Sequence, residues 1–162
     1  MHLLRILQLL ALLALANGTP VMVNKLLGKR FSCPLDGGAT FVDGRPLFGA
    51  SKTIRGIVLS VLVTAACSPL LGLDWRIGLA VGGLSMAGDL FSSFLKRRMR
   101  LPAGGRATGL DQIPESLFPL LACRSALSLT VMDIASVVAI FFVGEILLSV
   151  LFYKLRLRER PY

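Results

Sequence analysis

The chain has 162 residues, of which 54% are apolar and 17% are charged, and its formal net charge is +9. Soluble domains carry about 45–50% apolar and about 25% charged residues, so this composition indicates a protein of the lipid bilayer. Five spans of about 20 residues would use about 100 residues, which excludes a separate soluble catalytic domain. The only histidine is His2, next to the N-terminus, which excludes a histidine-based triad. The three cysteines form no CxxC pair, so neither a zinc site nor a disulfide framework is expected.

Apolar stretches predict an all-α, polytopic membrane protein in which residues 1–162 form a single membrane-embedded domain. Spans are expected at about residues 3–23, 54–73, 77–95, 116–132 and 134–153. Two long loops, 24–53 and 96–115, and the C-terminal tail hold most of the lysines and arginines, which mark the cytoplasmic side of membrane proteins. All three basic segments lie on one side only with five spans, so the N-terminus is expected outside and the C-terminus in the cytoplasm. A cleaved signal peptide is the alternative for the first stretch, but it would place a basic loop outside.

The positive charge is therefore explained by topology rather than by nucleic-acid binding. Side chains that stack on bases are also scarce, with one Trp and two Tyr. We expect a multi-pass protein of the cell membrane that binds no nucleic acid.

A polar stripe follows the third expected span at the spacing of one helical face. Its members are Ser85, Asp89, Ser92, Ser93 and Lys96. A carboxylate in a span costs several kcal/mol unless it is paired or hydrated, which makes Asp89 a candidate functional residue. The alternative is a polar seam packed against another helix. Because Asp89 leads into the basic cluster 96–98, we favour a divalent cation held beside bound phosphates.

The second long loop supplies another carboxylate, Asp111, in the turn 109–112. Asp89 and Asp111 flank the same basic loop, so we expect them to share one or two Mg²⁺ ions. Glu115 follows closely, and for this residue a helix N-terminal role is an equally good interpretation.

The first long loop contains glycines followed by lysine and threonine at the start of a span, which is typical of a phosphate cradle. It is not a Walker A loop, because Ala50 stands where lysine is required. The candidate phosphate contacts are Lys52, Thr53 and Arg55. A basic loop that only sets topology is the alternative. Asp36 and Asp43 are expected to pair with Arg45 or with the sugar of a nucleotide, and the sequence does not decide between these partners.

Two charged residues, Arg124 and Glu145, fall inside the expected fourth and fifth spans. Each lies at a similar distance from the inner end of its span. We therefore predict that they form a buried ion pair with a structural role.

Taken together, these segments resemble the CDP-archaeol synthase family, relatives of the CDP-diacylglycerol synthases. The matching stretches are residues 16–21, 34–38, 43–45, 51–56, 88–98, 109–112 and 153–155. The resemblance implies a five-span enzyme with a cytoplasmic active site that transfers a cytidylyl group from CTP to a lipid phosphate and releases pyrophosphate, with Mg²⁺ as cofactor.

The resemblance also implies roles for individual residues. Asp89 and Asp111 would be the metal carboxylates, and Asp89, Lys96 and Asp111 would form the catalytic set. The substrate-binding candidates are Lys52, Thr53, Arg55, Ser92, Ser93 and Arg97. The expected partners are CTP, a lipid phosphate and the bilayer, and a homodimer is left open.

Two other functions are alternatives for the same residues. A small transporter or channel would use Asp89, Arg124 and Glu145 as an intramembrane polar pathway, although no internal repeat supports it. A CDP-alcohol transferase would need an arginine and two further aspartates after Asp36, which the sequence lacks. Whether the lipid is ether- or ester-linked, archaeal or phosphatidic-acid-like, is left open.

Overall fold

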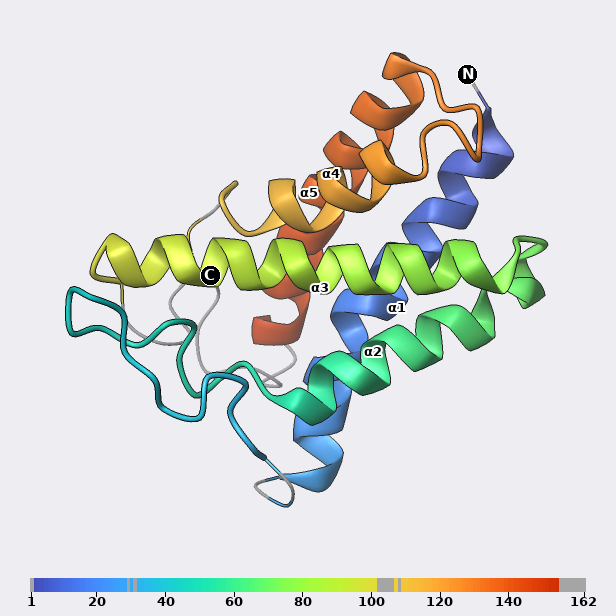
Figure 1. Ribbon diagram of the computed structural model, residues 1–162. Helices are drawn as coiled ribbons and strands as arrows, with labels where there is room; N and C mark the ends of the chain where they lie inside the picture. The colour runs from blue at the N-terminus through green and yellow to red at the C-terminus, as the bar shows by residue number, and fades with distance from the viewer. Residues whose placement is uncertain (1, 29, 31, 102–106, 108, 155–162) are drawn as a thin grey trace.

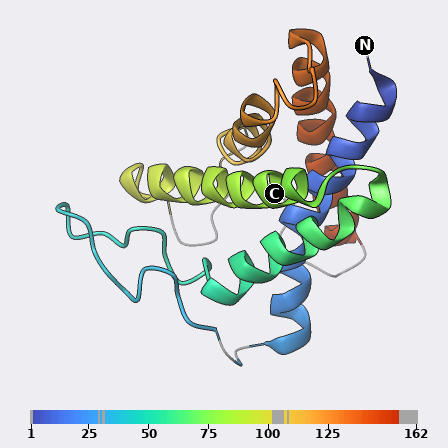
Figure 2. The same cartoon turned by 45° about the vertical axis from the view of Figure 1, so that its right-hand side comes forward.

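The computed structural model describes residues 2–28, 30, 32–101, 107 and 109–154, with side chains described as far as Ser149. The helices are α1 (Leu3–Leu27), α2 (Ile54–Cys67), the 3-10 helix η1 (Pro69–Leu71), α3 (Trp75–Arg98), α4 (Gln112–Ala122) and α5 (Val131–Lys154). In this part of the chain the fold is all-helical, with two isolated β-bridges and no strand. Helix α3 lies across the centre of the bundle, and the loop between α1 and α2 lies beside its C-terminal end (Figures 1 and 2).

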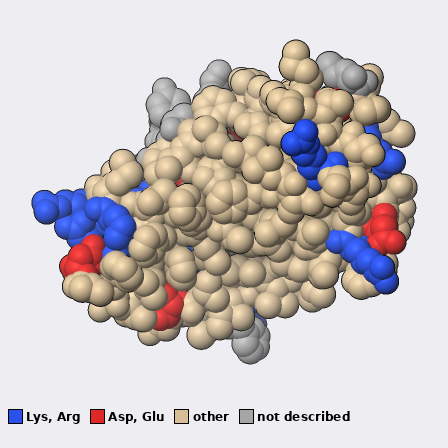
Figure 3. Space-filling model, turned by 45° about the horizontal axis from the view of Figure 1, so that its top comes forward, with Lys and Arg blue, Asp and Glu red and all other residues tan. Residues whose placement is uncertain are grey.

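Four helical stretches are long and apolar enough to cross a bilayer. They are Leu3–Leu27, Ile54–Leu71, Trp75–Arg98 and Val131–Ser149. Figure 3 agrees with this, since on the face it shows the charged residues gather toward two ends and uncharged surface separates them. The chain is therefore a protein of the membrane.

Helix α4 differs from the span expected at 116–132. It begins at Gln112 and ends at Ala122, so its 11 residues are about 16 Å long, roughly half the thickness of a hydrocarbon core. The helix ends because the following segment turns. Ser128 has a positive φ of 52°, and the Leu129 amide donates back to the Arg124 carbonyl at 2.9 Å.

Helix α5 begins three residues before the expected 134 because a capping box starts it. The Thr130 hydroxyl accepts from the Asp133 amide at 3.1 Å, and the Thr130 amide donates to Asp133 Oδ2 at 3.0 Å. This reciprocal pair satisfies amides that the first turn of a helix leaves without partners. Asp133 also accepts from the His2 amide at 2.9 Å, which ties the start of α1 to the start of α5.

Small residues bring α2 and α3 into close contact. A Cβ at Gly78 would lie 2.5 Å from the Thr64 carbonyl, and one at Gly82 would lie 3.1 Å from the Val61 Cα. The fully buried Ser60 hydroxyl donates to the Ala16 carbonyl at 2.6 Å, which adds α1 to this seam. Close backbone approach and hydroxyl contacts are the usual means of helix association in lipid.

Helices α3 and α4 touch at Gly88. A Cβ there would overlap the Pro114 carbonyl and would lie 2.7 Å from the Glu115 amide. The contact places α4 directly beside Asp89, the next residue of α3. The bundle therefore has two distinguishable ends. One end, called the His2 end, contains His2 and Asp133. At the opposite end α1 and α3 finish and α2 and α4 begin, and we call it the pocket end after the pocket described below.

The Gly88→Ala substitution is expected to destabilise the protein by about 3 kcal/mol, because a methyl group has to displace the α4 backbone rather than a flexible side chain. Thermal unfolding in detergent measures the effect. Gly83→Ala is the matched control on the same helix, since nothing lies within 4 Å of a Cβ at that position. Equal unfolding temperatures for the two variants would show that the close approach of α3 and α4 is not a constraint.

Candidate active site

A polar pocket of about 280 Å³ lies at the pocket end of the bundle. Side chains from α1, α3, α4, α5 and the loop before α2 line it. Seven of them are charged, namely Lys52, Asp89, Lys96, Arg97, Asp111, Glu115 and Glu145. The two metal carboxylates expected from the sequence, Asp89 and Asp111, thus line one cavity.

Two lysine–aspartate pairs dominate the pocket. Lys52 Nζ lies 2.5 Å from Asp89 Oδ1 and also contacts Oδ2, and each side chain is 20% exposed. Lys96 Nζ lies 2.7 Å from Asp111 Oδ1, with side chains that are 9% and 14% exposed. Each pair joins two elements, because Lys52 belongs to the loop before α2 and Asp111 precedes α4. The pairs neutralise charge that this partly buried site could not otherwise hold.

Helix geometry explains why α3 contributes so many pocket residues. Ser93 follows Asp89 by four residues, and Lys96 and Arg97 follow Ser93 by three and four, so all of them lie on one side of the helix. Ser93, Lys96 and Arg97 are each less than 10% exposed. Three of the five stripe residues, Asp89, Ser93 and Lys96, thus face the cavity. Ser85 lies outside it and bonds to Asn17 of α1, as expected for a polar seam between helices.

Three candidate substrate contacts do not line the pocket. Thr53 caps α2, where its hydroxyl accepts from the Gly56 amide at 3.3 Å. The fully buried Ser92 donates to the Asp89 carbonyl of its own helix at 2.9 Å. Arg55 turns toward the end of α1 and donates to Asn24 Oδ1 at 2.8 Å. Their roles toward a substrate stay predictions, whereas Lys52, Ser93 and Arg97 do line the cavity.

In the first long loop, where a phosphate cradle is expected, three backbone amides already donate to the side chain of Asp36. Asp36 accepts from the amides of Phe48 at 3.1 Å, Gly49 at 2.9 Å and Gly38 at 3.1 Å. These amides hold a carboxylate of the chain itself, so they do not form an open anion site. Burial alone would raise the pKa of Asp36, but the three amide hydrogen bonds outweigh it and lower the pKa below its ordinary value of 3.8.

The lowered pKa gives the loop a defined pH dependence. Since Asp36 has a lower pKa in the folded loop than in the unfolded chain, its stabilisation is complete above about pH 4 and is lost as the pH falls through the folded pKa. We expect exchange protection of the Phe48 and Gly49 amides to fall on acidification. Asp36→Asn is expected to lower that protection about tenfold already at pH 6, because a charge-assisted acceptor is lost. Hydrogen–deuterium exchange measures both. Wild-type protection in the variant at pH 6 would contradict the prediction.

The predicted ion pair between Arg124 and Glu145 is wrong. Arg124 is exposed in the turn after α4, and Glu145 lines the pocket. The two residues lie at different depths in the bundle. Arg124 lies in the turn before α5, whereas Glu145 lies 14 residues after Val131, the first residue of α5, which is about 20 Å along the helix. Sequence reasoning also missed Asn17 and Asn24 of α1 as pocket residues.

The donor set of the pocket suits Mg²⁺ bound together with a phosphate ligand. Within the described chain, no three His, Cys, Asp or Glu side chains come close enough to hold an ion by themselves. Mg²⁺ commonly takes only one or two carboxylates and completes its shell with phosphate oxygens and water. Asp89 and Asp111 fit this requirement, since each has a lysine whose flexible ammonium group can turn to a phosphate instead.

Paired acidic and basic side chains gather in a pocket at one end of a bundle of apolar helices, so the protein belongs to the class of membrane proteins with a site for a charged ligand. A family model described as CDP-archaeol synthase (CarS-like) matches residues 74–162. A CDP-archaeol synthase of Sulfurisphaera tokodaii is 35% identical over 153 residues, which cover 91% of this chain and 89% of the relative. The chain belongs to the CDP-archaeol synthase family.

Two further comparisons agree. A CDP-archaeol synthase of Hyperthermus butylicus is 35% identical over 120 residues, covering 68% of this chain and 67% of the relative. A solved structure, described as an intramembrane enzyme for archaeal membrane lipid biosynthesis, matches with a TM-score of 0.72 and 29% identity. That match covers 85% of this chain and 88% of the other. The arrangement of helices is thus shared with an enzyme of membrane lipid synthesis.

Proposed function

We propose that this protein transfers the cytidylyl group of CTP to the phosphate of a membrane lipid, giving CDP-lipid and pyrophosphate. Membership of the CDP-archaeol synthase family favours an archaeal-type ether lipid as the acceptor. The observation that carries the proposal is the pocket in which Lys52 meets Asp89 and Lys96 meets Asp111. Such a set of cations and carboxylates suits a triphosphate and its metal.

The reaction needs no general base, which agrees with a pocket that contains no histidine among its lining residues. An oxygen of the lipid phosphate is already anionic and attacks the α-phosphorus of CTP. The bond from that phosphorus to the bridging oxygen breaks, and the electron pair leaves with pyrophosphate. Lys52, Lys96 and Arg97 bind phosphate oxygens and stabilise the charge that develops on the leaving group.

Asp89 and Asp111 would hold Mg²⁺, which when bound neutralises phosphate charge and orients the triphosphate. Arrival of the nucleotide then exchanges partners inside the pocket. Lys52 and Lys96 turn from their carboxylates to phosphate oxygens, and the carboxylates become available as ligands. The N-terminus of α4 begins beside Asp111 and adds partial positive charge near the bound phosphates.

The proposed topology has five crossings, with the N-terminus outside and the pocket at the cytoplasmic face of the cell membrane. Residues 1–162 form one domain. The basic residues at the pocket end, such as Lys25, Arg45 and Arg98, support this orientation. The fourth crossing consists of α4 and the irregular segment 123–130, because α4 starts at the pocket end and α5 starts at the His2 end. A site at this boundary suits one water-soluble and one membrane-bound substrate.

The direct test is an assay of the purified protein with CTP labelled in the cytidine, Mg²⁺ and a lipid phosphate in mixed micelles. Label should move into a lipid extract, with one pyrophosphate released for each CDP-lipid formed. Parallel reactions with an isoprenoid ether lipid phosphate and with phosphatidic acid identify the acceptor. The proposal fails if neither lipid accepts label, and solute flux through liposomes without CTP consumption would favour a transporter instead.

A further inference from the structure

We infer that Arg98 is a positioning residue for this reaction, because it fastens the first long loop to the end of α3 and so keeps Lys52 in register with Lys96 and Arg97. The inference rests on the proposed cytidylyl transfer. Arg98 does not line the pocket, and its contacts all lie outside it. Arg98, Phe94 and the hairpin 39–47 together form a clamp between the loop and the helix.

The hairpin is a compact structure of its own. The Leu47 amide donates to the Ala39 carbonyl at 3.1 Å, and the Phe41 amide donates to the Arg45 carbonyl at 2.8 Å. Gly44 closes the tip with a φ of 73°, where an L side chain would be strained. The loop thus presents a fixed set of backbone carbonyls to α3.

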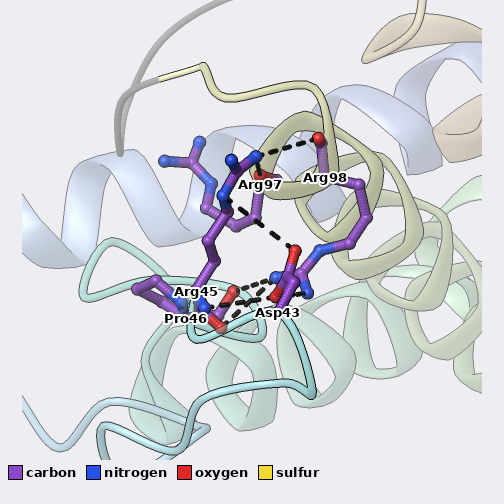
Figure 4. Close-up of polar contacts among 5 residues, drawn as sticks. All are labelled: Asp43, Arg45, Pro46, Arg97 and Arg98. Carbon is purple, nitrogen blue, oxygen red and sulfur yellow. Dashed lines mark hydrogen bonds and ion pairs between the residues drawn. The ribbon is translucent and has the colours of Figure 1, made fainter.

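Two arginines cross between the hairpin and the helix end in opposite directions (Figure 4). Arg98 forms an ion pair with Asp43 and donates to the carbonyls of Pro46 at 2.7 Å and Arg45 at 3.3 Å. Arg45 reaches back and donates to the carbonyls of Arg98 at 3.1 Å and Arg97 at 3.4 Å, and its Nε lies 4.0 Å from Asp43. Arg45 therefore supplies a partner to the Arg98 carbonyl in the last turn of α3 and adds a second one to the Arg97 carbonyl, which also accepts from the Arg100 amide at 3.2 Å.

Aromatic contacts restrict the Arg98 guanidinium further. Its central carbon lies 4.9 Å from the Phe41 ring centre and 5.0 Å from that of Phe94. The two rings meet edge to face at 5.4 Å, one from the hairpin and one from α3. Only a planar guanidinium can stack on aromatic rings and also donate to several carbonyls in a fixed geometry, so lysine reproduces just part of this arrangement.

Backbone hydrogen bonds connect the segment after the hairpin to Lys52, which lines the pocket. The Lys52 amide donates to the Gly49 carbonyl at 3.1 Å, and the Leu35 amide donates to the Lys52 carbonyl at 2.8 Å. Asp36 holds the Gly49 amide, as described above. The loop is thus braced from the clamp to Lys52, whose side chain then meets Asp89 on α3.

The loop is consequently attached to α3 at two places, Asp89 and Arg98, about 14 Å apart along the helix. Under the proposed reaction one of these attachments is lost and the other is kept. Once Lys52 turns to a phosphate, its pair with Asp89 is gone, and the clamp is the attachment that keeps the loop on α3. The clamp should therefore matter most in the nucleotide-bound enzyme.

The test compares Arg98→Ala and Arg98→Lys with Arg100→Asn, all in the full-length protein. Arg100 is exposed and has a φ of 64°, which asparagine tolerates, so this control removes one positive charge from the same end of α3. We expect Arg98→Ala to raise KM for CTP about tenfold while KM for the lipid phosphate stays within about twofold of wild type. Arg98→Lys should give an intermediate KM, and Arg100→Asn should match wild type.

A second measurement does not depend on activity. Hydrogen–deuterium exchange without substrates should be faster at the amides of residues 41–45 and 47 in Arg98→Ala, and unchanged in Arg100→Asn. Asp43→Asn, a milder change at an exposed position, should raise KM for CTP in the same direction and add little to Arg98→Ala.

Distinct outcomes separate the two proposals. If wild-type protein makes no CDP-lipid, the proposed function fails, whatever the exchange results are. If wild type is active and Arg98→Ala loosens the hairpin but leaves KM for CTP unchanged, or raises both KM values equally, the positioning role is overturned. Unchanged exchange in Arg98→Ala overturns the clamp itself.

Discussion

The Asp89→Asn variant is expected to form CDP-lipid at least about 100-fold more slowly than wild type, a loss of about 3 kcal/mol in transition-state stabilisation. The substitution keeps the size of the side chain but removes its charge. Lys52 then loses its ionic partner, and the proposed metal site loses one of its two carboxylates. Label transfer from CTP into the lipid extract under saturating substrates measures the effect.

The matched control is Asp74→Asn at the opposite end of the same helix. Asp74 caps α3 by accepting from the Arg76 amide at 2.7 Å, and asparagine is an equally good cap. This variant should fold and turn over like wild type. Wild-type turnover in Asp89→Asn would show that the Asp89 carboxylate has no role in the reaction, and it would contradict the proposed metal site.

The second large effect is expected for Lys96→Gln, in stability as well as in activity. Lys96 and Asp111 are both largely buried, so removal of the ammonium group takes from this carboxylate its 2.7 Å ion pair and leaves Arg97 as a remaining cation that acts on it. Breaking such a pair from one side costs about 3 kcal/mol or more. We expect a clear drop in the thermal unfolding temperature in detergent, together with a turnover reduced about 100-fold because a cation near the leaving group is lost.

The double variant Lys96→Gln, Asp111→Asn separates the two effects. Neutralising both partners removes the unpaired charge, so most of the lost stability should return while activity stays low. Lys25→Gln, an exposed change in the last turn of α1, serves as the control for charge at the pocket end. Restored turnover in the double variant would show that Lys96 acts only by stabilising the fold.

Composition and periodicity predicted much of this molecule, since lipid-facing helices need long apolar runs and a polar stripe inside one of them is easily seen. Asp89, Ser93 and Lys96 follow the spacing of one helical face, and the structure directs that face into a cavity. The pairing of Asp111 with Lys96 was not predictable, because it depends on how closely α4 lies against α3. Gly88, which permits that approach, carries no signal of its own in a single sequence.

The errors have local causes. Hydropathy extended the fourth span through Arg124, although residues 130–133 form a threonine-to-aspartate capping box that starts a new helix. That signal was present in the sequence and would have placed Arg124 before the start of the fifth helix, outside a continuous fourth span. The glycine-rich first loop suggested amides open to an anion, but Asp36 accepts from those of Gly38, Phe48 and Gly49, and nothing in the spacing of the residues reveals an internal ligand. The phosphate contacts expected at Lys52, Thr53 and Arg55 stay predictions.

The short α4 also affects the surrounding lipid. In the proposed topology, one crossing offers only an 11-residue helix, followed by a polar turn that contains Arg124. Lipid chains next to this crossing meet a hydrophobic surface thinner than that beside α1 or α5, and a bilayer adapts to such mismatch by local thinning. We therefore expect the activity of the enzyme to depend on the chain length of the surrounding lipids. The lipids beside α4 should be the most deformed of those that contact the protein.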